Sequence, residues 1–491
     1  MTRTGKQYLE SLRDGRQVWL DGELVTDITT HPAFRNTAKS IADLYDLTHE
    51  PALVDTLTVP GADGDRVHRA YEIPRSYEDL VARRKAYKVW SEASFGFLGR
   101  SPDYMAGGIA GFQAVPDIFA TDTFDGRANV EAYHRRMSQG DLYPTFTITN
   151  PQIDRTKPAS EQEEDDLYVR VVKEQDNGIV VRGAKMIGTA AVFGDEVIVG
   201  TIEPLAPQDV EYALSFSIPI DTPGLKFISR TSYEAAARSV FDNPLSSRFD
   251  ENDALLVCDD VFVPWERVLV YRDVRASLLQ WWGTAAWPNF VHQAATRFWT
   301  KMEFLSGLAI LIAKANNSYE LPPVQNQIGK IMGWLTIARS MVLAAEAAYE
   351  PVPGGEGVRI NNEIASAHRA MSGDLYPKML QEVKLIAGGG LIQLPASGLD
   401  LLHPELGGLV KKYVRSPGHP AERRMKLFKL AWDALGSEFA SRHEQYERFY
   451  HGAPHIYFPS IVRDGNPELL EALVEKCMSG YELADEPGVA G

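Results

Sequence analysis

The sequence has few cysteines and no arrangement of them that would bind a metal. Only Cys258 and Cys477 occur among 491 residues, far apart and outside any Cys-x-x-Cys pattern. Neither a disulfide framework nor a thiolate metal site is therefore expected. Both thiols are predicted to be buried and to pack as small hydrophobic side chains.

Long apolar runs and an excess of positive charge are missing too. The longest apolar stretch, around Phe304 to Ala313, is too short to cross a bilayer, and no apolar segment follows the charged residues of the N-terminus. Fifty Lys and Arg against 66 Asp and Glu give a net charge of -16, which repels nucleic acid and anionic membranes. We expect a cytoplasmic protein that binds neither.

Several enzyme signatures are absent from the chain. It has no Gly-x-Gly-x-x-Gly after a strand, no phosphate-binding loop, no Gly-x-Ser-x-Gly and no His-Glu-x-x-His. These absences weaken the case for nicotinamide binding and for zinc-dependent hydrolysis. The eleven histidines are scattered, and His292 and His443 are interpreted as core or surface residues. No metal site is predicted.

Hydrophobic periodicity divides the chain into three predicted regions. Residues 1–145 are mainly helical, and residues 146–275 contain β-branched, alternating segments typical of an antiparallel β domain. The Asp176 to Gly178 segment predicts a hairpin turn, because Asn-Gly tolerates positive φ. Residues 276–491 predict long helices near 325–350, 362–387 and 420–450 that pack as a bundle. The predicted fold class is mainly α with a central β domain.

The most distinctive local motif is the segment from Gly99 to Tyr104. Ser101 suits a helix cap, Pro102 the first helical position, and Asp103 the positive end of the helix dipole. Arg100 and Tyr104 would then lie beside unpaired backbone N–H groups, where a phenolate or carboxylate is stabilised. The alternative is an ordinary capped helix with a surface arginine and a half-buried tyrosine.

A second motif is the strand from Thr145 that runs into the Asn150-Pro151 turn. Polar groups at strand ends are well placed to hold a ligand on a rigid support. The strands that follow supply Arg182, Lys185 and Thr189. These residues could hydrogen-bond a cofactor, or they could simply face solvent.

Taken together, the motifs resemble the oxygenase component of the 4-hydroxyphenylacetate 3-monooxygenase family. The resemblance covers nearly the whole chain, from Arg3 to Leu9 (RTGKQYL) and Thr30 to Phe34 (THPAF) through to Gln445 to Phe449 (QYERF). Its central motifs are Arg100 to Met105 (RSPDYM), Thr149 to Gln152 (TNPQ), Arg182 to Met186 (RGAKM), Pro244 to Arg248 (PLSSR) and Asp259 to Arg267 (DDVFVPWER).

The resemblance implies an acyl-CoA-dehydrogenase-like fold with an N-terminal helical domain (1–145), a middle β-barrel (146–275) and a C-terminal four-helix bundle and tail (276–491). It implies FAD that arrives as FADH2 from a separate NAD(P)H-flavin reductase, with O2 as co-substrate. The reaction would be hydroxylation of a small aromatic substrate through a C4a-hydroperoxyflavin. A homotetramer, built as a dimer of dimers, is also implied.

The resemblance further implies the roles of individual residues. Arg100 and Tyr104 would be catalytic. The substrate would bind to Arg100, Ser101, Tyr104, Phe146 and Thr201. The flavin would contact Phe146, Thr147, Ile148, Gln152, Ile153, Asp154, Arg155, Thr189, Pro454, His455, Ile456 and Tyr457.

One position departs from the family pattern. Phenol-hydroxylating relatives have a histidine that helps to hold the phenolic oxygen, whereas this sequence has Phe146, which can only stack or fill space. We therefore expect a substrate other than 4-hydroxyphenylacetate, such as an indole, a polycyclic phenol or a carrier-bound tyrosine-like unit. A flavin dehydrogenase of the same fold and a catalytically altered scaffold stay open as alternatives.

Overall fold

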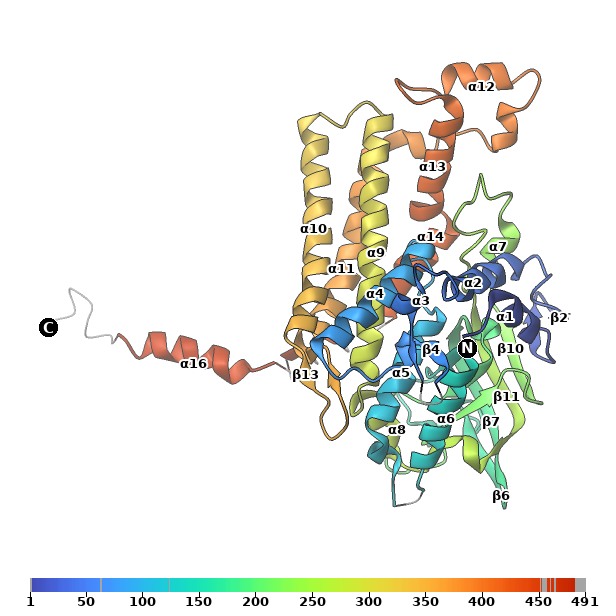
Figure 1. Cartoon of the computed structure of the whole chain (residues 1–491), viewed down its shortest axis with the longest axis vertical. Coiled ribbons are helices and arrows are strands. Elements are labelled where there is room, and N and C mark those ends of the chain that lie inside the picture. Colours follow the sequence, from blue (N-terminus) through green and yellow to red (C-terminus); the bar gives the residue numbers. More distant parts are fainter. Residues whose placement is uncertain are drawn as a thin grey trace.

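The computed structural model describes residues 2–61, 64–122, 124–450, 452, 457–459, 461–462 and 465–481. The part before Pro144 is mainly helical, as predicted, and also contains short strands (Figure 1). The helices of this part are α1 (Gly5–Ser11), α2 (Arg35–Leu47), α3 (Val54–Leu57), α4 (Tyr77–Ala93), α5 (Pro102–Ala114) and α6 (Arg127–Gly140).

The middle of the chain forms two sheets. The larger has the strand order β2-β1-β10-β11-β7-β6 and the smaller β12-β9-β8-β5. Their strands are β1 (Gln17–Leu20), β2 (Glu23–Val25), β5 (Pro144–Thr147), β6 (Arg170–Gln175), β7 (Gly178–Thr189), β8 (Glu196–Val199), β9 (Leu214–Pro219), β10 (Leu225–Ser229), β11 (Asp253–Pro264) and β12 (Val268–Tyr271). Short strand pairs are β3 (Thr58–Pro60) with β4 (Arg66–His68), and β13 (Glu350–Pro351) with β14 (Val358–Arg359).

The sheets differ from the antiparallel domain that the sequence predicts. Strands β1 and β2 come from the first 145 residues, and β1 pairs in parallel with β10, as β5 does with β8. Only strands that follow one another closely are forced to run antiparallel by a hairpin, and β1 reaches the sheet from far away in the sequence.

The hairpin at Asp176 forms, but its backbone is not the expected one. Gln175 pairs with Gly178 across the turn between β6 and β7. None of Asp176, Asn177 and Gly178 has a positive φ. The Asn-Gly pair therefore marks the turn correctly without using the left-handed conformation that motivated the prediction.

The C-terminal part is a bundle of long helices. It contains α8 (Val274–Trp282), α9 (Ala286–Ala315), α10 (Pro322–Ala347), α11 (Asn362–Ala387), α13 (Ala421–Leu435) and α14 (Glu438–Phe449), with the short α7 (Tyr233–Ala236) beside it and α12 (Gly407–Tyr413) at its far end (Figure 1). The predicted helix over 420–450 breaks at Gly436, between α13 and α14. Phe298, Met302 and Leu305 of α9 are fully buried in the bundle core.

Helix α10 is long and apolar, although much of it is exposed. By length and composition it could cross a membrane, and only 28% of its most apolar window is buried. The longest apolar run of the sequence, around Phe304 to Ala313, lies instead in α9. Buried core helices of soluble proteins also satisfy this criterion, so one such helix is weak evidence of a membrane span.

The last described helix, α16 (Pro467–Met478), extends away from the bundle (Figure 1). Its leucines are exposed, and so is Cys477, which corrects the prediction that both thiols are buried. Cys258 on β11 is buried, as predicted. The difference arises because β11 lies inside a sheet, whereas no other element in the described part of the chain covers α16.

Helix α5 occupies the junction between the sheets and the bundle. It packs closely on α9, since a side chain at Gly111 would place its Cβ 2.2 Å from the backbone nitrogen of Ala286. The N-terminus of α5, with Arg100 immediately before it, is thereby held between β5 and the C-terminal helices. This junction is where the candidate site lies.

Candidate active site

The start of α5 is tied to α9 by a buried polar cluster. Pro102 occupies the first turn as predicted, but the Ser101 side chain does not cap the helix. Its hydroxyl instead donates to Asp103 Oδ1 at 2.6 Å, and Gln293 Nε2 donates to both Ser101 and Asp103 at 3.2 Å. Burial raises the pKa of Asp103 to about 7. These contacts fix the residues on either side, Arg100 and Tyr104.

The guanidinium of Arg100 lies among four aromatic rings. Its Cζ is 4.0 Å from the ring centroid of Tyr104, 5.3 Å from Phe146, 5.4 Å from Tyr446 and 5.6 Å from Tyr450. Its Nη2 donates to the Tyr450 carbonyl at 3.3 Å, and its buried Nη1 has no partner in the described part of the chain. No ion pair of Arg100 is found among the described residues, so its guanidinium could bind an anion.

The ring of Tyr104 is one of three stacked aromatic rings. It stacks on Phe290 of α9 at 4.6 Å and 9°, and on Phe146 of β5 at 5.9 Å and 17°. Trp281 of α8 borders Phe146 at 6.3 Å. Burial raises the pKa of Tyr104, and nearby Arg100 only partly opposes this. The phenol therefore stays protonated at neutral pH and can donate a hydrogen bond.

Behind the tyrosines is a fully buried charge cluster. Glu447 of α14 accepts two hydrogen bonds from Arg297 at 2.6 and 2.8 Å and one from Lys301 at 2.7 Å. Burial would raise the pKa of Glu447, but the two cations outweigh it and lower the pKa to about 2. Burial lowers the pKa of Lys301 to about 8 in spite of this ion pair. The cluster anchors α14, and so Tyr446 and Tyr450, to α9.

Three threonines predicted at the site lie near this junction. Thr147 follows Phe146 on β5, and its carbonyl accepts from the backbone of Gly200, next to Thr201. The carbonyl of Thr201 accepts from Trp281 Nε1 at 2.8 Å. The hydroxyls of Thr147 and Thr201 are buried and lack partners in the described residues. Thr189, at the end of β7, donates to Asp253 at 2.6 Å.

Other predicted cofactor contacts are less enclosed. Ile148 is partly buried, and the loop after β5, which carries the predicted Gln152, Ile153, Asp154 and Arg155, lies largely at the surface. Within this loop Asp154 accepts from Thr156. Tyr457 is buried, with its ring 5.1 Å from Arg369 of α11. Pro454, His455 and Ile456 lie outside the described residues.

The remaining candidates serve the fold. Arg182 forms exposed ion pairs with Asp260 and Asp166, whereas the buried Lys185 donates to Asn150 at 2.7 Å. His292 is paired with Glu346 in the core. Over the ranges that the structure describes, no group of three His, Cys, Asp or Glu side chains could hold a metal ion.

Sequence reasoning missed much of what surrounds Arg100. Tyr446 and Tyr450 come from α14 and Phe290 from α9, far from Arg100 in the sequence. The sequence held one signal for this network. Arg297 and Lys301 are four residues apart, beside the apolar stripe of a helix that the hydrophobic pattern places in the core. Charges on a buried helical face need partners, and they indicate a buried network.

The arrangement suits a flat aromatic ligand with polar edges. Parallel rings lie at this junction, and Arg100 Nη1 and the hydroxyls of Thr147, Thr201 and Tyr446 are buried without a partner among the described residues. An isoalloxazine or a phenol carries oxygens and nitrogens that could satisfy such groups.

Comparison with known proteins gives a consistent result. Residues 4–270 match the family model described as 4-hydroxyphenylacetate 3-hydroxylase N terminal, and residues 278–479 match the corresponding C-terminal model. The 4-hydroxyphenylacetate 3-monooxygenase oxygenase component of Pseudomonas aeruginosa is 36% identical, with 98% of this chain and 93% of that protein covered.

Two further proteins are similar to this chain, and their names specify different substrates. The (3S)-3-amino-3-(3-chloro-4-hydroxyphenyl)propanoyl-[peptidyl-carrier protein SgcC2] monooxygenase of Streptomyces globisporus is 39% identical over 98% of this chain and 91% of its own. A crystal structure of the oxygenase component of 4-hydroxyphenylacetate 3-monooxygenase complexed with FAD matches with a TM-score of 0.92 and 35% identity, over 98% of this chain and all of that one.

Proposed function

Because the chain belongs to the 4-hydroxyphenylacetate 3-hydroxylase family, we propose that it hydroxylates an aromatic substrate that binds beside Arg100 and Tyr104. It is the oxygenase component of a flavin-dependent aromatic monooxygenase, with FAD as cofactor and O2 as co-substrate. The observation that carries the site is the Arg100 guanidinium, which lies among four aromatic rings and whose Nη1 has no partner among the described residues. The fold is acyl-CoA-dehydrogenase-like.

The residues present fit a reduced flavin. We propose that Phe146, Thr147, Thr189 and the loop from Gln152 to Arg155 hold it. Within the described residues the buried Thr147 hydroxyl has no partner, and the Thr189 hydroxyl donates to Asp253 and leaves its oxygen to accept, so both could bond the polar edge of an isoalloxazine. Reduced FAD, when bound, supplies the electrons that activate O2 for insertion into the ring. The proposed domain limits are 1–145, 146–275 and 276–491, with β1 and β2 joining the sheet of the second domain.

The protein's own side chains bind and orient the substrate. Arg100 offers a cation to a phenolate or carboxylate. The attraction between the two charges is stronger at a buried site than at the surface, because less water screens it. Tyr104, kept protonated by burial, donates a hydrogen bond to the same oxygen. The rings of Phe146, Phe290 and Trp281 exclude water from the reacting edge and restrict the orientation of a flat ligand.

The partner is a separate reductase component, as the term oxygenase component implies. We propose that this reductase uses NAD(P)H and that the oxygenase works as a homotetramer in the cytoplasm. Exposed apolar side chains support assembly, since Met332 and Ile337 of α10 and Leu469 and Leu473 of α16 would be covered by other copies.

We propose that the substrate is an aromatic compound held by stacking and by its anionic end, and not 4-hydroxyphenylacetate itself. Phe146 offers no hydrogen bond, and it lies parallel to Phe290 with 6.0 Å between centroids. A larger ring system gains more from such a stacked surface than a single phenol does. A carrier-bound tyrosine-like unit is compatible with the same chemistry.

Replacing Phe146 with histidine should improve the use of simple phenols. An imidazole at this position adds a hydrogen bond to the phenolic oxygen, which is worth about 1.5 kcal/mol when one partner is charged. We expect KM for 4-hydroxyphenylacetate to fall about 10-fold, measured by product formation under a constant supply of reduced FAD. Phe146→Leu is the control, because it removes the ring without adding a hydrogen bond. Equal KM values for the two variants would contradict the assignment.

The function is tested with labelled oxygen. Purified protein is mixed anaerobically with chemically reduced FAD and then with ¹⁸O₂, in the presence of 4-hydroxyphenylacetate, 4-nitrophenol, indole or carrier-bound tyrosine. We expect tight binding of reduced FAD and one ¹⁸O atom in a hydroxylated product of at least one compound. A flavin dehydrogenase would oxidise its substrate without gaining label, and an altered scaffold would bind flavin without product. Either result would reject the proposal.

A further inference from the structure

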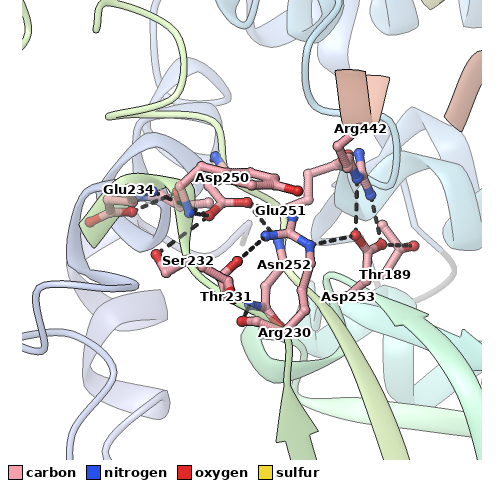
Figure 2. Close-up of polar contacts among 12 residues, drawn as sticks. Thr189, Arg230, Thr231, Ser232, Glu234, Asp250, Glu251, Asn252, Asp253 and Arg442 are labelled. Carbon is pink, nitrogen blue, oxygen red and sulfur yellow. Dashed lines mark hydrogen bonds and ion pairs between the residues drawn. The ribbon is translucent and has the colours of Figure 1, made fainter. Parts of the chain in front are cut away.

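Arg442, in the first half of α14, pairs with two carboxylates at once (Figure 2). Its Nη1 donates to Glu251 Oε2 at 3.0 Å, while Nε and Nη2 donate to Asp253 Oδ2 and Oδ1 at 2.9 and 2.7 Å. All three guanidinium nitrogens are therefore used. The planar fork of arginine allows this geometry, and a lysine ammonium cannot reproduce the two parallel bonds to one carboxylate.

The first carboxylate reaches the substrate side of the site. The other oxygen of Glu251, Oε1, accepts from the backbone nitrogen of Arg100 at 2.6 Å, and the Arg100 carbonyl accepts from the Tyr143 hydroxyl. Both backbone groups of Arg100 are thus held by side chains from other elements. Glu251 is only 2% exposed, so water cannot readily replace it.

The second carboxylate reaches the cofactor side. Asp253 Oδ1 accepts from the Thr189 hydroxyl at 2.6 Å, and Oδ2 also accepts from Arg230 at 2.9 Å (Figure 2). Burial would raise the pKa of Asp253, but Arg442 and then Arg230 outweigh it and hold this pKa well below its usual range. Since its proton is committed to Asp253, the Thr189 oxygen is left to accept hydrogen bonds from a ligand.

The backbone strengthens the connection between the two carboxylates. The amide of Ala190, next to Thr189, donates to the carbonyls of both Glu251 and Asn252 at 3.1 Å. Asn252 has a φ of 57°, a left-handed conformation that asparagine tolerates better than most residues. The end of β7 and the start of β11 therefore form one rigid block, with Arg442 closing it from the helical bundle.

We propose that Arg442 is a positioning residue that sets Arg100 and Thr189 at a fixed separation through Glu251 and Asp253. The inference rests on the proposed function, in which Arg100 meets the substrate and Thr189 meets FAD. A bundle helix would then align the aromatic ring with the cofactor without touching either. Alignment matters because a misplacement of about 1 Å can cost on the order of 100-fold in rate.

The experiment compares Arg442→Lys with two variants that each neutralise one of the carboxylates that Arg442 bonds, Glu251→Gln and Asp253→Asn. Three quantities are measured: the Kd of reduced FAD by anaerobic fluorescence, KM for the aromatic substrate, and product formed per reduced FAD consumed. We expect Arg442→Lys to raise both Kd and KM about 5- to 10-fold and to halve the product yield. Glu251→Gln should raise mainly KM, and Asp253→Asn mainly Kd. Arg135→Gln, which removes an exposed ion pair of α6, is the matched control.

The outcomes separate positioning from a purely structural role. If Arg442→Lys lowers the melting temperature but leaves KM, Kd and product yield at wild-type values, the proposal is wrong. Equal shifts of KM and Kd in both Glu251→Gln and Asp253→Asn would also overturn the proposal. If Arg442→Lys does not fold, these two variants alone provide the test. Failure of the wild-type chain to bind reduced FAD would overturn the proposed function and this inference together, whereas wild-type binding with unaffected variants would overturn the inference alone.

Discussion

The Arg100→Met variant is expected to lose about 10²- to 10³-fold in kcat/KM for hydroxylation, the loss typical of removing one preorganised donor from a developing negative charge. Methionine keeps much of the side-chain length and can still pack among Tyr104, Phe146, Tyr446 and Tyr450. What it removes is the buried cation, whose Nη1 has no partner in the part of the chain that the structure describes. The stability of the protein should change little, because Arg100 has no ion pair to lose among the described residues.

The measurement is product formation at several substrate concentrations with reduced FAD supplied at a constant rate. Arg100→Lys separates charge from geometry: a lysine restores a cation but not the planar fork, so we expect partial recovery, within about 10-fold of the arginine enzyme. Arg135→Gln serves again as the exposed control. If Arg100→Met keeps wild-type kcat/KM, the anion site does not lie at Arg100.

The Glu447→Ala variant is expected to lose about 3–5 kcal/mol of unfolding free energy, because it leaves two buried cations without their partner. Arg297 and Lys301 are both fully buried and both contact Glu447. The loss is measured by urea denaturation. Glu444→Ala is the matched control on the same helix, since its ion pair with Arg448 lies at the surface and should contribute about 0.5 kcal/mol or less.

The buried carboxylate of Glu447 also predicts that the stability of the protein depends on pH. Its pKa in the folded chain, about 2, lies below the ordinary value of about 4.3 for an unfolded glutamate. A lowered folded-state pKa contributes stability that is fully present above about pH 4.3 and is lost as the pH falls towards about 2. Wild-type stability should therefore fall steeply over this window, and Glu447→Ala should lack that part of the slope. Parallel acid profiles for the two proteins would contradict the buried pair.

The sequence alone determined the order of the elements and the start of α5. Helices and strands differ in hydrophobic period, so the helix, strand, helix order was readable, and α11 begins and ends where the pattern placed it. Pro102 marked the first turn of α5 because its fixed φ suits that position. The capping role of Ser101 was wrong, since a buried Asp103 competes for its hydroxyl, and only the tertiary structure shows that burial.

The surroundings of Arg100 were decided by the tertiary structure. Its hydrogen bond to the Tyr450 carbonyl joins residues 350 positions apart, and the ring of Tyr446 approaches it from the same distant helix. Glu251 and Arg442, which also form a hydrogen bond, are 191 positions apart. Sequence periodicity reports which face of an element is buried, but it carries no information about which other element covers that face. The partners of a buried charge are therefore fixed only when the sheets, α5 and the bundle pack together.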